Sequence, residues 1–215
     1  MEAIEFTGPT SPTRAERRRF DSRARLLSAA RRLFVERGYH GTRSQDVARA
    51  AGVGHGTFYL HFSDKQECFL AFVEDAHHEL ERELAARIPP DADLEGRIRA
   101  LLFAVHAFDR RNPGVLAAAM SDLGVIAARE APRESLVDRW AREWASALTS
   151  AMTLGTVRDD YDPLLVGHAI VGLLQGATRG GHAQRIGRTQ VIENLTRFLV
   201  RALLPPGHER PRRTP

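Results

Sequence analysis

Apolar residues recur along most of the chain with the period of an α-helix, and no segment alternates apolar and polar residues for long enough to predict a strand. Between residues 23 and 37 the apolar positions follow the i, i+3, i+4, i+7, i+8 spacing of one helical face. They are Leu26, Ala29, Ala30, Leu33 and Phe34. Gly38 follows as a stop signal. The pattern predicts an all-α protein whose first helix spans residues 23–37.

Capping residues and helix breakers divide the rest of the chain into further predicted helices. Thr42 with Gln45, and Ser63 with Gln66, have the spacing of capping boxes. Pro132 and Pro163 suit the first position of a helix. The expected helices span residues 43–51, 55–62, 64–87, 98–111, 114–128, 132–152, 163–178 and 191–203. The helix at 163–178 is apolar almost all round, so we expect it to be buried on several sides.

Positive charge is concentrated in the first third of the chain. Residues 1–65 hold 12 Lys and Arg against 7 Asp and Glu, and six of these arginines lie within residues 14–25. We interpret residues 1–19 either as a solvated terminal segment or as a flexible basic arm that meets DNA phosphate. The single cysteine, Cys68, cannot form an internal disulfide, and from the sequence pattern we expect neither a secretory signal nor a membrane span. We therefore expect a soluble, cytoplasmic protein.

Two short predicted helices around the segment GVGHGTFYLHF, residues 52–62, favour a helix-turn-helix. Gly52 suits the sharp turn, Ala48 a close helix crossing, and Val47, Val53 and Phe58 the wedge between the helices. A nucleotide-binding glycine loop would need a strand before Gly52 and the spacing G-x-G-x-x-G. The preceding segment is helical and the spacing is G-x-G-x-G. The pattern therefore favours a DNA-reading motif.

The run GYHGTRSQDVARAAGVGHGTFYLHFSDKQECF, residues 38–69, resembles the DNA-binding domain of TetR-family transcriptional repressors. The shared features are a first helix ending in F and GY, then T, D-V-A, AGV, G-T-F-Y-L-H-F and a lysine early in the fourth helix. The match covers about residues 20–72. It implies an N-terminal three-helix DNA-binding domain followed by a larger helical domain for effector binding and dimerisation.

The resemblance implies four regions and a repressor that binds a palindromic operator as a homodimer. We expect a flexible basic arm at 1–19, the DNA-binding domain at 20–66, the helical domain at 67–204 and a flexible tail at 205–215. A small apolar or amphipathic effector would tilt the helix at 64–87 and release the DNA. An activator, or a regulator without a ligand, remains an alternative on the same fold.

The resemblance also implies roles for single residues in DNA binding. The second helix of the motif would enter the major groove, where we expect His55 and Thr57 to contact base edges. Arg43 could reach a base or a phosphate. The residues expected at phosphates are Thr42, Ser44, Tyr59, His61 and Lys65, the chain's only lysine. For Tyr59 the alternative is a ring packed in the core of the small domain with its hydroxyl exposed.

The C-terminal half is expected to supply the dimer surface and the effector pocket. The helices at 163–179 and 189–203 would pair across a two-fold axis, with Gly172, Gly176 and Gly180 either allowing that close crossing or packing within the subunit. The candidate pocket residues, each of which also suits the core, are Phe103, His106, Met120, Trp140, Trp144, His168 and Gln175.

We expect no catalytic or metal-binding site in this chain. The sequence lacks G-x-S-x-G, H-E-x-x-H and paired C-x-x-C, so no catalytic residue and no cofactor is predicted. One E-x-x-H occurs at Glu74–His77, but di-iron helical bundles need two copies and two further glutamates. A metal-bearing bundle enzyme is the remote alternative, and His77 and His78 are expected to be solvated.

Overall fold

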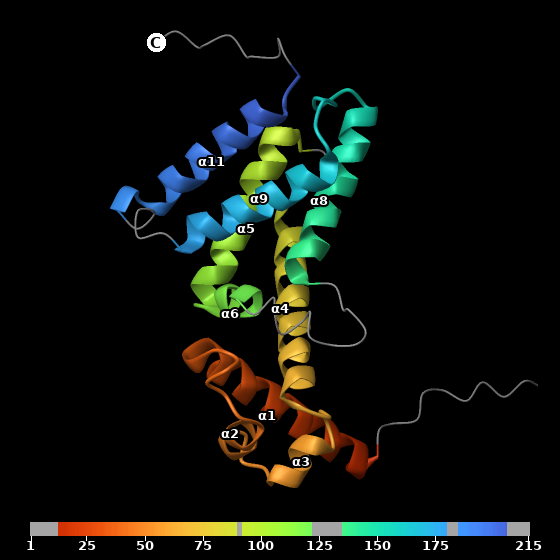
Figure 1. The fold of residues 1–215 in the computed structure, drawn as a ribbon, viewed down its shortest axis with the longest axis vertical. Helices are drawn as coiled ribbons and strands as arrows, with labels where there is room; N and C mark the ends of the chain where they lie inside the picture. The colour runs from red at the N-terminus through yellow and green to blue at the C-terminus, as the bar shows by residue number, and fades with distance from the viewer. Residues whose placement is uncertain (1–12, 90–91, 122–134, 180–184, 206–215) are drawn as a thin grey trace, which may run out of the picture. The chain divides into compact units, whose positions relative to one another are not determined.

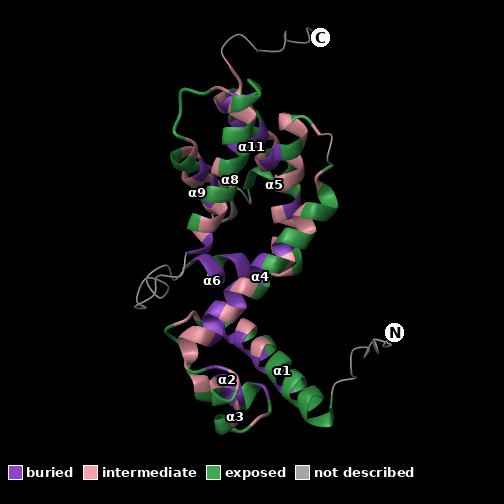
Figure 2. Ribbon diagram, turned by 90° about the vertical axis from the view of Figure 1, so that its right-hand side faces the viewer, coloured by how far each residue is buried: buried purple, intermediate pink, exposed green. Residues whose placement is uncertain are grey.

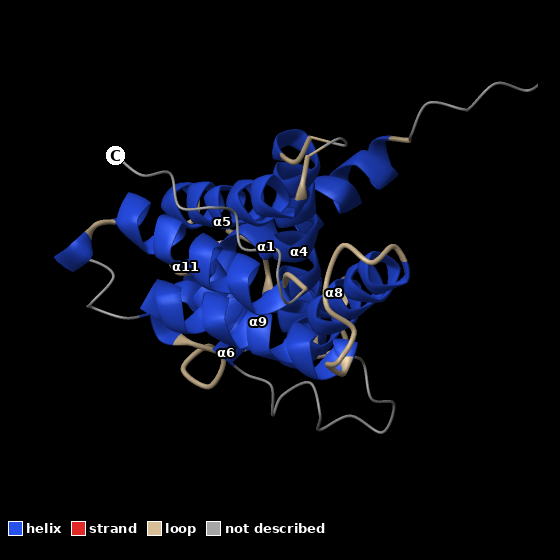
Figure 3. Ribbon diagram, turned by 90° about the horizontal axis from the view of Figure 1, so that it is seen from above, coloured by secondary structure: helices blue, strands red, loops and turns tan. Residues whose placement is uncertain are grey.

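The computed structural model describes residues 13–89, 92–121, 135–179 and 185–205, and within these ranges every regular element is a helix (Figure 3). The elements are α1 (Arg14–Arg37), α2 (Ser44–Ala50), α3 (His55–Tyr59), α4 (Lys65–Arg87), α5 (Leu94–Arg111), α6 (Val115–Ser121), α8 (Leu136–Thr153), α9 (Pro163–Arg179) and α11 (Arg188–Leu203). The all-α prediction is confirmed. Outside the described residues lie 1–12 of the expected arm, 122–128, Pro132, Gly180 and most of the tail.

The chain divides into two compact units, and the first ends at Phe72. This is six residues later than the boundary expected after residue 66. The reason is packing by the first turns of α4, because the rings of Phe69 and Phe72 lie 5.1 and 5.7 Å from the ring of Phe34 on α1. These buried aromatic rings form the core of the small unit, and α4 continues beyond it as one helix.

Helix α1 begins at Arg14, nine residues before its predicted start. Thr13 and Glu16 form a capping box, in which the Glu16 amide donates to Thr13 Oγ1 at 3.2 Å and the Thr13 amide donates to the Glu16 carboxylate at 2.7 Å. Hydrophobic periodicity missed these turns because they carry almost no buried residue; Ser22 is the exception. Residues 14–19, expected to belong to a flexible arm, are therefore helical.

Both capping boxes predicted near the motif are wrong. Thr42 is fully buried, and its hydroxyl donates to the Gly38 carbonyl at 2.9 Å, so α2 starts after Arg43 without a side-chain cap. At α4 the cap lies one residue later than expected, since the Asp64 carboxylate accepts from the Glu67 amide at 2.7 Å. Helix α3 also ends at Tyr59 instead of residue 62.

The second unit is a helical assembly in which α8 packs along α9 and α5 packs along α11 (Figure 1). Its buried positions lie on the inner faces of these helices (Figure 2). The core cluster consists of Ile98, Leu102, Leu148, Val157, Ile170, Ile192, Leu199 and Leu203. Gly167 permits the close approach of α9 to α8, because a Cβ at this position would lie 2.2 Å from the Ala141 carbonyl oxygen.

Two helices of this unit, α9 and α11, expose apolar residues in the single chain. In the single chain, α9 is not buried on several sides: Leu165 is 70% exposed, and Gly172 and Gly176 are exposed, with no atom within 4 Å of the point where a Cβ would lie. On α11, Phe198 is 57% exposed. The core-facing side is instead Ile192, Thr196, Leu199 and Leu203. None of the described helices is long and apolar enough to cross a membrane.

Candidate nucleic-acid interface and ligand cavity

Helices α2 and α3 form a helix-turn-helix whose geometry depends on one glycine and two buried side chains. Gly52 has a φ of +65°, a backbone conformation that favours glycine. The next amide, of Val53, donates to the Ala48 carbonyl at 3.0 Å and closes the turn. Val47 and Phe58 are fully buried between the helices. Of the predicted wedge, Val47 and Phe58 are therefore in place, whereas Val53 is only partly buried. The two buried side chains fix which face of α3 points outward.

The outward face of α3 carries the two residues predicted to contact bases. His55 is exposed in the first turn and Thr57 is partly exposed. Tyr59 is 52% exposed, so the alternative of a core ring is wrong; its ring stands edge-on to the His55 ring at 5.1 Å. This contact orients an imidazole and a phenol on the same short helix. Such a surface can offer hydrogen bonds to base edges and to phosphate oxygens.

The start of α2 presents only some of the groups predicted to meet phosphate. Arg43 is exposed and Ser44 is partly exposed at the beginning of the helix. Thr42 is not available, because its buried hydroxyl serves the end of α1. A threonine at this position stabilises the turn between α1 and α2. Contrary to the prediction, the Thr42 side chain is therefore not placed to contact phosphate.

His61 and Lys65 are both held within the small unit. His61 Nε2 lies 2.7 Å from Ser22 Oγ, and the Ser22 hydroxyl donates to the Arg19 carbonyl, so Nε2 must carry the proton. Burial, together with the charges of Arg19 and Arg23, lowers the pKa of His61. Lys65 Nζ donates to the Tyr39 carbonyl at 2.8 Å and lies 4.0 Å from the Tyr39 ring centre.

A large cavity of about 1810 Å³ lies in the second unit. Of the predicted pocket residues, it is lined by Met120, Trp140, Trp144 and Gln175. The wall is mostly apolar, with side chains such as Leu84, Leu101 and Leu174. The volume exceeds the roughly 300–1,000 Å³ of usual small-molecule sites, and the wall composition resembles theirs.

Three predicted pocket residues do not line this cavity, because their helices turn them elsewhere. Phe103 is 40% exposed on α5. His106 Nε2 lies 3.4 Å from Arg188 on α11. His168 Nε2 lies 3.1 Å from Asp138, and this carboxylate together with the Leu164 carbonyl raises the pKa of His168. Periodicity identified the helices but not the side of each that faces the cavity.

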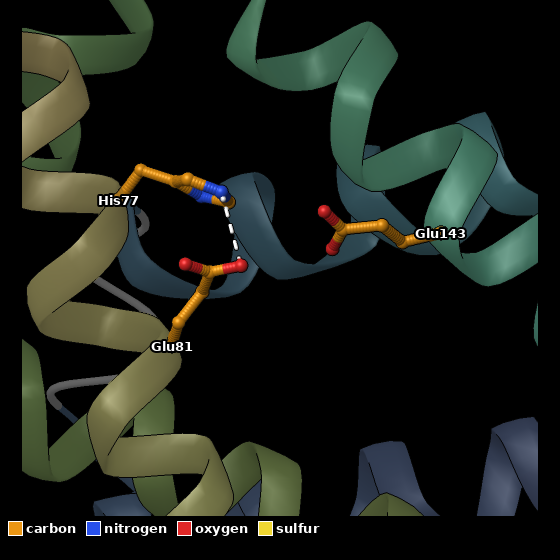
Figure 4. Close-up of side chains that lie close together, drawn as sticks. All are labelled: His77, Glu81 and Glu143. Atoms are coloured by element: carbon orange, nitrogen blue, oxygen red, sulfur yellow. Dashed lines mark ion pairs between the residues drawn. The ribbon is translucent and has the colours of Figure 1, made fainter. Parts of the chain in front are cut away.

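Two acidic residues in the cavity wall were missed at the sequence level. Glu81 on α4 and Glu143 on α8 both line the cavity. Burial, together with the negative charge of Glu81, raises the pKa of Glu143. No motif marks this pair, since the two residues are 62 positions apart in the sequence and meet only because α4 and α8 are neighbours (Figure 4).

His77 lies beside these two glutamates, and the three side chains have the spacing of possible metal ligands (Figure 4). His77 is 3% exposed, so the expectation that it is solvated is wrong. The Trp140 indole donates to its Nδ1 at 3.0 Å, which places the ring proton on Nε2, the atom 3.3 Å from Glu81. A protonated Nε2 cannot bind a cation, so this bonding favours a structural role over a metal site.

Comparisons with known proteins agree with the helix-turn-helix and the all-α fold. The family model described as "Bacterial regulatory proteins, tetR family" matches residues 26–72. Over 190 residues the chain is 24% identical to the transcriptional repressor DhaR of Mycobacterium sp. (strain GP1), covering 85% of this chain and 92% of that protein.

Two further similar proteins match different shares of this chain. The transcriptional activator FasR of Mycolicibacterium smegmatis is 35% identical over 109 residues, which is 48% of each chain. A solved structure described as a gamma-butyrolactone receptor (ArpA like protein) is 25% identical, with 88% of this chain and 91% of that chain covered and a TM-score of 0.65. By their names, the three similar proteins are thus a repressor, an activator and a receptor, and none of the three names describes an enzyme.

Proposed function

Because the chain belongs to the TetR family of bacterial transcriptional regulators, we propose that it is a ligand-responsive repressor that binds a palindromic operator as a homodimer. The observation that carries the proposal is the outward face of α3, where His55, Thr57 and Tyr59 stand over the buried Phe58. The repressor DhaR resembles this chain over most of its length, which supports the sign of regulation. The protein would act in the cytoplasm, where the DNA is.

In the proposed complex α3 lies in the major groove. His55 and Thr57 contact base edges and so carry sequence preference. Arg43, Ser44, Tyr59 and Lys65 contact the phosphate backbone and carry affinity with little preference. The exposure of Arg43, Ser44 and Tyr59 supports these roles, whereas Lys65 would have to use donors beyond the one that Tyr39 accepts.

The proposed dimer surface consists of the exposed apolar faces of α9 and α11. Leu165, Gly172 and Gly176 lie on one exposed side of α9, and Phe198 is 57% exposed on α11. Exposed apolar faces of this kind mark interaction surfaces. A two-fold pairing would bury both faces and let the glycines approach the partner's backbone. It would also present two reading helices to two half-sites.

The proposed effector is a small apolar or amphipathic molecule that enters the cavity of the second unit. Its wall combines Trp140, Trp144 and Met120 with the amide of Gln175, which can orient a polar group. The structural likeness to a gamma-butyrolactone receptor supports a ligand of this size and polarity. Leu80 and Leu84 of α4 belong to the wall, and the same helix begins in the DNA-binding unit. A ligand that binds two positions of α4 unequally would therefore change DNA affinity.

Activation is the second candidate for the sign of regulation. The activator FasR is 35% identical to this chain over 109 residues, so DNA recognition of this type serves both outcomes. The fold and the reading helix would be the same in either case. Only the position of the operator relative to the promoter separates them.

The proposal is tested by selecting bound fragments from random duplex DNA. We expect a palindrome whose half-sites are about one helical turn apart, roughly 34–36 Å. His55→Ala and Thr57→Ala should alter the selected sequence, whereas Ser44→Ala should weaken all sequences equally. A compound screen on the selected palindrome then tests release. Selection that enriches no sequence, or an asymmetric site occupied by one chain, would refute the dimeric operator reader.

A further inference from the structure

A small hollow beside the reading helix joins two arginines of α1 to the third helix of the motif. The hollow has a volume of about 470 Å³, and its wall is formed by Arg18, Arg19, Ser22, Thr57, Leu60 and His61. Arginines 18 and 19 belong to the early turns of α1, where the sequence predicted only a flexible arm. The structure thus places two guanidinium groups on a helix next to Thr57.

The position of these arginines is fixed by two sets of contacts. The capping box of Thr13 and Glu16 closes the first turn of α1, so the arginines follow an ordered helix start. Farther along, His61 Nε2 and Ser22 Oγ are 2.7 Å apart, which ties α1 to the segment after α3. Two guanidinium groups are therefore presented from a defined backbone, so little backbone entropy remains to be lost on binding there.

The charge around the hollow is positive and has few acidic partners. Residues 14–25 contain six arginines against Glu16 and Asp21, and Glu16 is bonded to Thr13. Among the described residues, neither Arg18 nor Arg19 has an acidic side chain within ion-pair distance. Arg23, one turn farther along, lies over the Phe62 ring at 5.5 Å. An anion is the ligand that this arrangement of charge favours.

The neutral His61 ring does not itself supply a donor to that anion. Its Nε2 proton is directed to Ser22, which leaves Nδ1 as an acceptor facing away from that bond. His61 therefore holds α1 against the motif, and the donors come from the arginines. A guanidinium offers paired N–H groups in a planar fork that matches two oxygens of a phosphate.

We propose that Arg18 and Arg19 of α1 clamp a backbone phosphate of the duplex whose major groove α3 reads. This inference rests on the proposed DNA-binding function and adds a contact that belongs to no part of the helix-turn-helix. It replaces the flexible arm, over residues 14–19, with a helical element of defined geometry. The clamp adds affinity without sequence preference, and it sets how α3 enters the groove by holding the strand beside it.

The test measures the salt dependence of binding, which counts phosphate contacts without an operator sequence. The probe is a fluorescein-labelled 30-base-pair duplex of mixed sequence, titrated by anisotropy at several KCl concentrations. Because the two arginines share one phosphate, Arg18→Gln/Arg19→Gln should lower the slope of log K against log salt by about 1 and weaken binding about tenfold near 0.1 M salt. The matched control, Arg32→Gln/Arg110→Gln, removes two charges from exposed arginines that do not line the hollow. The control should keep the slope of the wild type.

The outcomes separate this inference from the function on which it rests. If the wild type binds the duplex and the Arg18/Arg19 variant keeps its slope, the clamp is refuted and DNA binding stands. If the wild type does not bind duplex DNA even at low salt, both fail. An equal loss in the test and control variants shows a general charge effect and also refutes the clamp. Thermal melting of each variant, followed by circular dichroism, distinguishes a loss of binding from a loss of fold. We expect unchanged melting temperatures because the substituted arginines are exposed.

Discussion

The Trp140 indole Nε1 donates a hydrogen bond to His77 Nδ1 at 3.0 Å, and so joins α8 to α4 within the second unit. The neighbouring Arg139 makes a paired contact with Glu74, with both N–O distances at 3.1 Å. The two contacts hold α8 to the helix that also begins in the DNA-binding unit. The contacts that join α8 to α4 are therefore concentrated on one short stretch of α4.

Trp140→Phe should lower the free energy of unfolding by about 1–3 kcal/mol, because it leaves the buried His77 Nδ1 without its donor. The measurement is urea unfolding at pH 7.5. Trp144→Phe is the matched control, since it makes the same substitution one turn along α8 in the same cavity wall. Equal losses in the two variants would show that ring volume, and not the hydrogen bond, is what matters.

Stability should also fall as pH falls below about 6.5 through the protonation of His77. Burial lowers the pKa of His77 in the folded chain, so the unfolded chain takes up the proton first. The contribution is complete above the unfolded pKa and is lost as pH falls from there toward the folded pKa. We expect His77→Asn, which keeps an acceptor near Trp140, to flatten the curve between pH 5 and 7. If His77→Asn leaves the dependence of stability on pH unchanged, other histidines must cause that dependence.

Phe198→Glu should convert the proposed dimer into a monomer. Its ring is 57% exposed on α11, and a carboxylate buried at a two-fold axis would face its own copy. Sedimentation should show the dissociation constant raised by at least about 30-fold, the effect of losing a strong interface residue. Phe103→Glu introduces the same charge at a ring that is 40% exposed on α5. If Phe103→Glu dissociated the dimer and Phe198→Glu did not, the dimer surface would not lie on α9 and α11.

Gly167→Ala should destabilise the second unit by about 1–3 kcal/mol. The added Cβ would meet the backbone of Ala141, which cannot move aside as a side chain can. Gly172→Ala adds a methyl group to the same helix where no atom lies within 4 Å, and should stabilise it by about 0.5–1 kcal/mol. Both are measured by urea unfolding in the Phe198→Glu background, so that dimerisation does not contribute. Similar values for the two variants would contradict the close crossing at Gly167.

Thr196→Val should raise the free energy of unfolding by about 1 kcal/mol. Thr196 is 2% exposed among apolar residues of α11, and its hydroxyl has no hydrogen-bond partner among the described residues. Valine keeps the shape and removes the unpaired group. Thr149→Val, at an exposed hydroxyl bonded to the Ala145 carbonyl, should change stability little. A loss of stability on Thr196→Val would mean that the hydroxyl has a partner in solution.

Lys65→Ala should have two effects, one on the fold and one on DNA. It removes the bond to the Tyr39 carbonyl and the contact with the Tyr39 ring, so thermal melting should occur at a lower temperature. If the ammonium also contacts phosphate, the salt slope falls by about 1 for operator and mixed-sequence DNA alike. A lower melting temperature with an unchanged slope would leave Lys65 with a structural role alone.

The sequence determined the helical fold and the motif because those features are local. The spacing of Leu26, Ala29 and Leu33 fixes one face of α1, and Gly52 with Val47 and Phe58 fixes the turn and wedge of the reader. The same reasoning failed at the first turns of α1. They are held by a cap at Thr13 and carry no apolar stripe, so hydrophobic periodicity had nothing to detect.

Only the tertiary structure decided which side of each helix is free and which residues far apart in the sequence meet. Phe198 and Leu199 are adjacent and similarly apolar, yet the first is exposed and the second lies in the core. Likewise, Glu81 lies near Glu143, and Arg18 and Arg19 line the same hollow as Thr57, only because the fold brings their helices close together. Helical periodicity shows which side of a helix is apolar. Which other element that side packs against depends on the tertiary fold. That neighbour is chosen by the free energy of the whole assembly.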